Sequence, residues 1–347
     1  MIGDTQQQEV GDGALAVQAH RDVTVNVGLT YENVRTLALD TFRAEFVKML
    51  DMAGAIAEAR ATRLLNEYIA RVERENHTSL GNASDPDFRY SLYMAQKIAA
   101  RSGDADLQSL LVELLVQRSH QPIRSFVQLV LSESIEAIQK ISAAQINALT
   151  LVFAIKHMKF LTVSSFATLL DTLDQYVEPL LRDIAGSNAS ISHLEYAGCG
   201  TVNTTEKFEM NKAMLCFYPG AFQSGVSEAD VCVKVLSPAA RTLLVQCEHD
   251  ARHVQVLGGS LENVRALCDQ FNLAINDRKM LEAIFNSRSQ VKLLECCASR
   301  RPYFDHLWKV WDDTQLSNFS LTSVGFAIAH ANLSKFGPIR PLTDWIH

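Results

Sequence analysis

The fold of this chain is decided by residues 31–76, YENVRTLALDTFRAEFVKMLDMAGAIAEARATRLLNEYIARVEREN, a stretch without proline and with one glycine, Gly54. Thr30, directly before it, is a good helix N-cap. Apolar residues then recur at spacings of three and four, which is the pattern of a coiled-coil seam: Leu39, Phe42, Phe46, Met49, Ala53 and Ile56. Further along, the apolar positions drift to another set: Ala57, Ala61, Leu64, Tyr68 and Val72. We expect one long helix, either a core helix of a single chain or part of an intermolecular coiled coil.

The residues before this helix alternate as a β-strand does. Apolar side chains occupy the odd positions of residues 15–29 except Arg21, and the even positions from Gln18 to Asn26 are polar. This period of two is typical of a strand with one buried face. One straight strand of this length would measure about 50 Å, so we expect a break near residues 20–22 and two short strands.

An isolated strand pair leaves backbone edges and an apolar face that need a partner. The pair either packs as a hairpin on the helices of its own chain or joins two subunits. We take the second possibility as the basis for a predicted interface, which comprises Leu15, Val17, Ala19, Val23, Val25 and Val27. The sequence thus predicts a homo-oligomer, with room for a further protein partner.

Capping residues mark the starts of helices in the rest of the amino-terminal half. They predict helix starts at Asp85 with Pro86, at Asp104, at Pro122 and at the capping box of Ser142 with Gln145. A last helix is expected over residues 163–184, ended by Gly186. Short connections of this kind are typical of neighbouring antiparallel helices.

The stretch 187–205 is rich in Ser, Asn, Gly and Thr, and all seven cysteines lie between Cys199 and Cys297. We place a domain boundary there. The predicted organisation is a polar tail with the β segment (1–29), a helical bundle (30–185) and a second, mostly helical domain (186–347). The fold class is mainly α. A winged-helix-like edge is an alternative for the last part of the chain, from Phe319, Leu321, Thr322, Gly325 and Ile328.

Composition limits the functional classes. The chain has 347 residues, 48% of them apolar, and a net charge of −7. This composition excludes a mainly disordered protein and disfavours broad binding of nucleic acid, which needs a basic face. A winged-helix regulator would need a basic patch around Arg300, Arg301 and Lys309. We find no apolar run of membrane-spanning length and no secretory signal, and the odd number of irregularly spaced cysteines favours reduced thiols in a cytoplasm.

Few residues suggest chemistry. Cys199 lies between Gly198 and Gly200, where an exposed thiol could use His193 as a base, although a glycine turn between helices is the more ordinary explanation. His249 and His253 are one helical turn apart but lack the glutamate of a metalloprotease helix. His330 and Asn332 are a polar pair that could line a pocket, although a role in helix capping or core hydrogen bonding is the more ordinary explanation. The sequence predicts no metal, no cofactor and no identifiable catalytic residue.

Several short motifs resemble an uncharacterised bacterial family known mainly by locus-tag labels. The motifs are Gly11-Asp12, Gln18-Ala19, Arg21-Asp22-Val23, Val27 to Tyr31, Leu37 to Phe42, Asp85 to Phe88, Arg101 to Asp104, Tyr196 with Gly198-Cys199, Leu321 to Gly325 and His330 to Asn332. The resemblance covers most of the chain. It implies a bacterial cytoplasmic protein from accessory or antiphage-defence gene sets, in which such β-motifs precede helical bodies, and it supplies no catalytic residues.

We therefore expect a non-enzymatic, self-assembling bacterial defence or stress protein that acts by oligomerisation and partner binding. The alternative is an effector enzyme whose dispersed site lies in the second domain, with Cys199, His193, His249, His253 or His330 as candidates.

Overall fold

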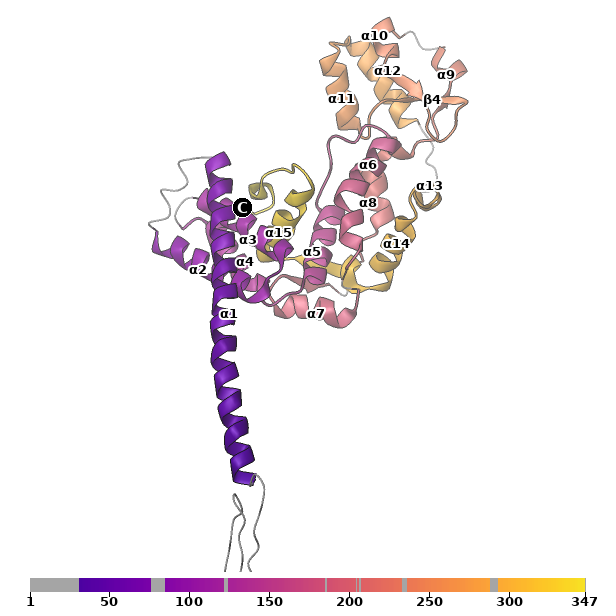
Figure 1. Cartoon of the computed structure of the whole chain (residues 1–347). Helices are drawn as coiled ribbons and strands as arrows, with labels where there is room; N and C mark the ends of the chain where they lie inside the picture. Colours follow the sequence, from indigo (N-terminus) through magenta and orange to yellow (C-terminus); the bar gives the residue numbers. More distant parts are fainter. Residues whose placement is uncertain are drawn as a thin grey trace, which may run out of the picture. The chain divides into compact units, whose positions relative to one another are not determined.

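The computed structural model describes residues 31–75, 85–121, 124–184, 186–203, 205, 207–232, 236–287 and 293–346, without the side chains of residues 31–50, 232, 293 and 294. The described part is mainly helical, which confirms the predicted fold class (Figure 1). The chain divides into two compact units, one ending at Glu58 and the other beginning at Ala59. All described residues of the first unit belong to one helix, α1.

The helices of the first half follow the capping pattern closely. They are α1 (Tyr31–Glu75), α2 (Pro86–Ser102), α3 (Ala105–Ser119), α4 (Phe126–Ile138), α5 (Ala143–Lys156), α6 (Phe166–Tyr176), the 3-10 helix η2 (Glu178–Leu181) and α7 (Asn188–Tyr196). The single long helix is confirmed. Asp85 and Asp104 cap α2 and α3 through their carboxylates, and Ser142 forms the predicted capping box with Gln145.

The second half contains shorter elements. Its helices are α8 (Met210–Phe217), η3 (Pro219–Phe222), α9 (Glu228–Cys232), α10 (Pro238–Arg241), α11 (Leu261–Gln270), α12 (Ile275–Asn286), α13 (Leu293–Arg300), α14 (Tyr303–Asp313), η4 (Gln315–Asn318), α15 (Ser323–Leu333), η5 (Ser334–Phe336) and η6 (Leu342–Asp344). Its strands are β1 (Gly200–Val202), β2 (Val226–Ser227), β3 (Leu244–Gln246), β4 (His253–Val256) and β5 (Phe319–Leu321).

Two local predictions need correction. The helix expected over residues 163–184 is split in two. The first part, α6, starts at the Ser165 capping box, and the second, the 3-10 helix η2, has Pro179 in its first turn. The helix assigned to Pro122 starts at Phe126, capped by Ser125, while Pro122 itself lies outside the described residues. The stretch 187–205, where the sequence predicts a domain boundary, contains α7 and β1.

One large core holds most of the second unit together. It extends from Leu64 to Ile346, and so contains helices from both sides of residue 186. The helix α15 lies at its centre and packs against α5, α4 and α3 (Figure 1). A second, smaller core joins residues between Val231 and Phe285, around the antiparallel sheet β2-β4-β3.

The smaller core is attached to the larger one by polar contacts at α6. Glu248 accepts hydrogen bonds from the backbone N–H groups of Phe166, at 2.6 Å, and Ala167, at 3.2 Å. A carboxylate at a helix N-terminus satisfies groups that have no partner inside the helix. The backbone N–H of Gly258 adds a hydrogen bond to the carbonyl of Ser164, at 3.0 Å.

Candidate functional site

The amino-terminal helix α1 carries the most unusual surface of the described chain. It is 45 residues long. Of its described side chains, none between Asp51 and Arg63 is buried. Met52 is 66% exposed and Ile56 is 48% exposed. Large apolar side chains exposed along one helix are typical of an interaction surface. This part of α1 is therefore the candidate functional site.

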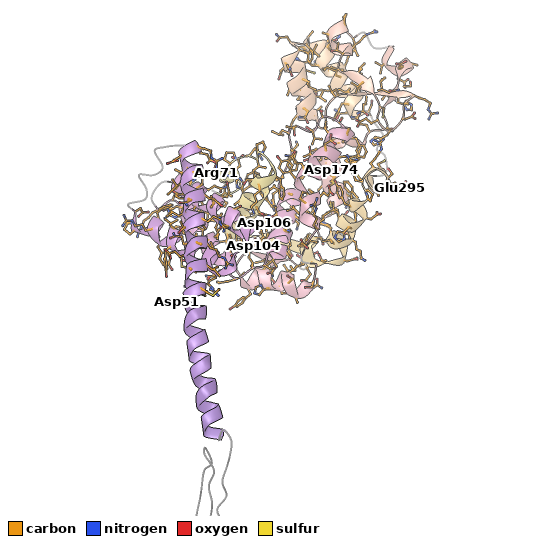
Figure 2. All side chains as sticks on the ribbon, viewed as in Figure 1. Asp51, Arg71, Asp104, Asp106, Asp174 and Glu295 are labelled. Atoms are coloured by element: carbon orange, nitrogen blue, oxygen red, sulfur yellow. The ribbon has the colours of Figure 1, made fainter. Side chains whose placement is uncertain are left out.

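The end of the same helix is packed into the core. Leu64 and Val72 are 0% exposed and Tyr68 is 3% exposed, with the Tyr68 ring 5.7 Å from that of Phe88 on α2. Arg71, labelled in Figure 2, donates to Glu113 Oε2 on α3 at 2.9 Å. These contacts bury one face of the helix along its last three turns.

The packed face and the seam point in different directions. At about 100° per residue, the mean direction of Ala53 and Ile56 lies about 90° from that of Leu64, Tyr68 and Val72. The drift of the apolar pattern in the sequence is thus a change from one face of the helix to another. Ile56 lies about 120° from the mean direction of the three packed residues and so belongs to another face, whereas Ala53 lies about 60° from it, between the two faces.

The other predicted interface is the β segment before α1. Its six residues, Leu15, Val17, Ala19, Val23, Val25 and Val27, lie outside the described residues. The β segment therefore stays a prediction.

The structure gives Cys199 a packing role. Its side chain is 0% exposed, and burial raises the pKa of its thiol to about 11. Gly198 adopts a φ of +80°, and a Cβ on Gly325 would collide with the Cys199 carbonyl. Thr322 closes the contact, because its hydroxyl donates to the Gly198 carbonyl at 2.7 Å. The glycines thus allow α15 to approach the chain closely, and the thiol is neither exposed nor activated as a nucleophile must be.

The histidines proposed as catalytic partners are dispersed. His193 is exposed on α7, with Nδ1 3.1 Å from the side-chain amide of Gln145. His249 places Nε2 2.8 Å from the carbonyl of Ala221. His253 lies 3.0 Å from an Asp250 carboxylate oxygen, at ion-pair distance but without hydrogen-bond geometry. Among the described residues, no hydrogen bond joins two of the five predicted candidates.

His330 belongs to a chain of polar contacts that ends at α1. Its Nε2 is 2.8 Å from the Arg340 carbonyl, and its Nδ1 is 3.3 Å from the amide of Gln117. The same amide donates to Glu113, the acceptor of Arg71, at 2.8 Å. Burial lowers the pKa of His330. The neutral imidazole is thus a structural link between α15 and the packed end of α1.

No sequence pattern pointed to a half-buried pair at the end of α5. Lys156 donates to the carbonyls of Ser317 at 2.9 Å and Phe319 at 2.8 Å, and burial lowers its pKa to about 8. The ring of His157 meets that of Phe326 edge to face, with 4.7 Å between the centroids, and burial with the neighbouring Lys156 charge lowers its pKa to about 4. Both groups hold η4, β5 and α15 against α5.

The winged-helix alternative is not supported by the pairing. The segment 319–321 forms β5, whose partner is β1, with Thr201 opposite Ser320. The proposed basic patch is also neutralised in part, because Arg301 donates to Asp174 at 2.7 Å and lies 3.5 Å from Asp171.

The described residues contain no group of three or more His, Cys, Asp or Glu side chains placed to hold a metal ion. Within the same residues, no helix combines the length and the apolar character needed to cross a bilayer. The six cysteines whose side chains are described are free thiols.

The fold and the surface define an α-helical protein with a long, partly unpacked amino-terminal helix. A family model described only as "-like" matches residues 28–346. The chain belongs to this family, whose description states no activity. The match begins after most of the amino-terminal β-motif. Neither the curated proteins nor the solved structures contain a match to the chain.

Proposed function

We propose that this protein works by self-assembly, and that the amino-terminal part of α1 joins copies of the chain as a coiled coil. The seam comprises Leu39, Phe42, Phe46, Met49, Ala53 and Ile56. The observation that carries the proposal is the exposure of Ile56, at 48%, at a position about 120° around the helix from the mean direction of Leu64, Tyr68 and Val72.

A second copy of the chain is the occupant that the seam fits best. A heptad seam on one helix is complementary to the same seam on another, since each apolar residue fills a hole between four residues of its partner. Five of the six seam residues are large, and burial is worth about 1.5–3 kcal/mol for each such side chain. Ten of them in a dimer offset the association cost of about 4–15 kcal/mol.

The β segment is a second contact in the same assembly. Its predicted interface residues, Val23, Val25 and Val27 among them, lie directly before α1 in the sequence. Helices joined by the seam would bring these segments together, which raises their effective concentration and favours pairing between strands.

The family resemblance suggests the setting for such an assembly. We propose that it serves bacterial defence against phage, in the cytoplasm, with a further protein partner. A plaque assay in a bacterial host tests this setting. The wild-type protein should reduce plaque numbers, and a variant that cannot assemble should not.

The assembly itself is tested by a matched pair of substitutions. Ile56→Glu places a charge in the seam, where burial of an unpaired ion costs several kcal/mol. Ala55→Glu adds the same charge at an exposed neighbouring position of α1, about 100° around the helix. Sedimentation velocity should show a smaller species for Ile56→Glu and the wild-type species for Ala55→Glu. Equal sedimentation of all three proteins would contradict the proposal.

A further inference from the structure

A cavity of about 520 Å³ lies within the second unit, and none of the five candidate catalytic residues lines it. Its walls are the amino-terminal turns of α3 and α5, the segment after η2, and the end of α15 with η5. The volume is in the range of pockets that hold small molecules, about 300–1,000 Å³.

The floor of the cavity is apolar except for one amide. Leu110 is 0% exposed, and Ile146 and Asn332 are each 5% exposed. A buried polar side chain in an apolar wall needs a hydrogen-bond partner for each of its polar atoms, and leaving one unpaired costs about 1–3 kcal/mol. Asn332 is therefore the residue that reveals what the cavity accepts.

The orientation of the Asn332 amide follows from its neighbour. The Thr150 hydroxyl donates its only proton to the Ile146 carbonyl at 2.7 Å. It can therefore only accept from Asn332, whose Nδ2 lies 2.9 Å away. The Asn332 Oδ1 makes no hydrogen bond to any described residue, and it is not among the described buried atoms that lack a partner, so it is open to the cavity and not sealed in the core. A molecule in the cavity that carries an N–H or O–H group would supply the missing donor.

The rim carries charges of both signs. Asp104 uses its carboxylate to accept from the backbone of Asp106, at 2.9 Å, and of Leu107. The carboxylates of Asp106 and Asp183 form no ion pair with another described residue, and neither does the Arg182 guanidinium. The Lys335 ammonium donates to the Asp106 carbonyl at 2.9 Å. The rim therefore presents two carboxylates and two cations.

We propose that this cavity binds a small zwitterion of amino-acid type, with an apolar side chain that ends in a hydrogen-bond donor. Arg182 and Lys335 bind its carboxylate, helped by the first N–H groups of α5, which have no partner inside the helix. Asp106 and Asp183 bind its ammonium group. The side chain packs on Leu110 and Ile146 and donates to Asn332 Oδ1. This inference is independent of the assembly through α1.

The test is calorimetric titration of the full chain with L-tryptophan and L-tyrosine. Both carry the two charges, an aromatic body and a donor. Tryptamine lacks the carboxylate, indole-3-propionate lacks the amine, and phenylalanine lacks the donor. Each removed group should weaken binding by at least about tenfold, the loss expected for a hydrogen bond to a charged or buried group.

A matched pair of variants locates the site. Ala143→Trp places a large side chain at the cavity mouth, on the exposed first turn of α5. Ala189→Trp makes the same change on the exposed first turn of α7, which does not line the cavity. Tryptophan should bind the Ala189→Trp protein as it binds the wild type, and should bind Ala143→Trp at least about tenfold more weakly.

A second variant keeps the test valid if Ala143→Trp does not fold. Arg182→Gln combined with Lys335→Met removes two exposed cations, and should weaken tryptophan while leaving tryptamine unchanged. The proposal is overturned if neither tryptophan nor tyrosine binds at millimolar concentration. Equal binding of tryptophan to wild type and Ala143→Trp, or of tryptamine and tryptophan to wild type, would overturn it as well.

Discussion

The two ends of α1 are parts of one helix that meet different surroundings. At its carboxyl end Leu64 and Val72 are 0% exposed, whereas Met52, three turns earlier than Leu64, is 66% exposed. Both parts of the helix carry large apolar side chains among charged ones, so composition does not distinguish them. The difference lies in the face that each presents, and it teaches that, among the described side chains of α1, the chain's own core buries residues only from Leu64 onward.

The largest effect is expected where α1 is packed. Leu64→Ala should lower the free energy of unfolding by about 2–5 kcal/mol, because it removes buried methyl groups and leaves a cavity. Ile56→Ala on the exposed side should change the stability of the monomer by less than about 0.5 kcal/mol. Urea unfolding at low protein concentration measures both. Similar losses for the two variants would remove the distinction between the ends of the helix.

The stability of the second unit also depends on pH through His157, which is half-buried at the end of α5. Unfolded histidine has a pKa of about 6.5, and burial lowers the pKa of His157 to about 4 in the native protein. Between these values the unfolded chain binds more protons, so stability falls as the pH falls from about 6.5 to 4 and is unaffected above that window.

His157→Gln should remove this part of the pH dependence. Between pH 7 and pH 5 the wild type should lose about 1–2 kcal/mol more than the variant, as read from urea midpoints. His306→Gln, a change on the exposed side of α14, should keep the wild-type slope. If His157→Gln has the same slope as well, the native protein does not lower the pKa of His157.

The cysteines extend the contrast between buried and exposed positions. Cys216 is exposed, while Cys199 and Cys297 are buried and burial raises their pKa values to about 11 and about 12. Iodoacetamide at pH 7.5 should therefore label Cys216 first, as mass spectrometry of the native protein would show. Fast labelling of Cys199 would instead revive the alternative of a nucleophilic enzyme.

The sequence could predict features that depend on interactions between residues close together in the chain. Asp104 and Ser142 mark helix starts because a cap needs only residues within one turn. Partners far apart in the chain leave no such signal: β1 pairs with β5 more than a hundred residues later, and both strands are three residues long. The sequence therefore indicated none of the strands β1 to β4, and it suggested a strand at β5 only within the winged-helix alternative.

The same limit applies to the sites. The seam of α1 could be read from spacing alone, because it is a property of one helix. The cavity could not, since its walls come from α3, α5, η2 and α15. The pair of His330 and Asn332 was recognised as polar, but its two members serve different neighbours: Gln117 and Thr150.

The smallest effect on stability is expected in the β segment. Val25→Asp puts a charge on the face shared with Val23 and Val27, which should lower the oligomeric state and leave the helical content nearly intact. Circular dichroism and light scattering measure the two quantities. Global unfolding of this variant would place the segment in the chain's own core and end its role in assembly.

The central claim is tested most directly by the mass of the full-length protein in solution. Multi-angle light scattering at micromolar concentration should give a multiple of 38.5 kDa, and deletion of residues 1–29 should lower the oligomeric state or weaken it. A protein that is strictly monomeric, both at full length and after that deletion, would contradict the account.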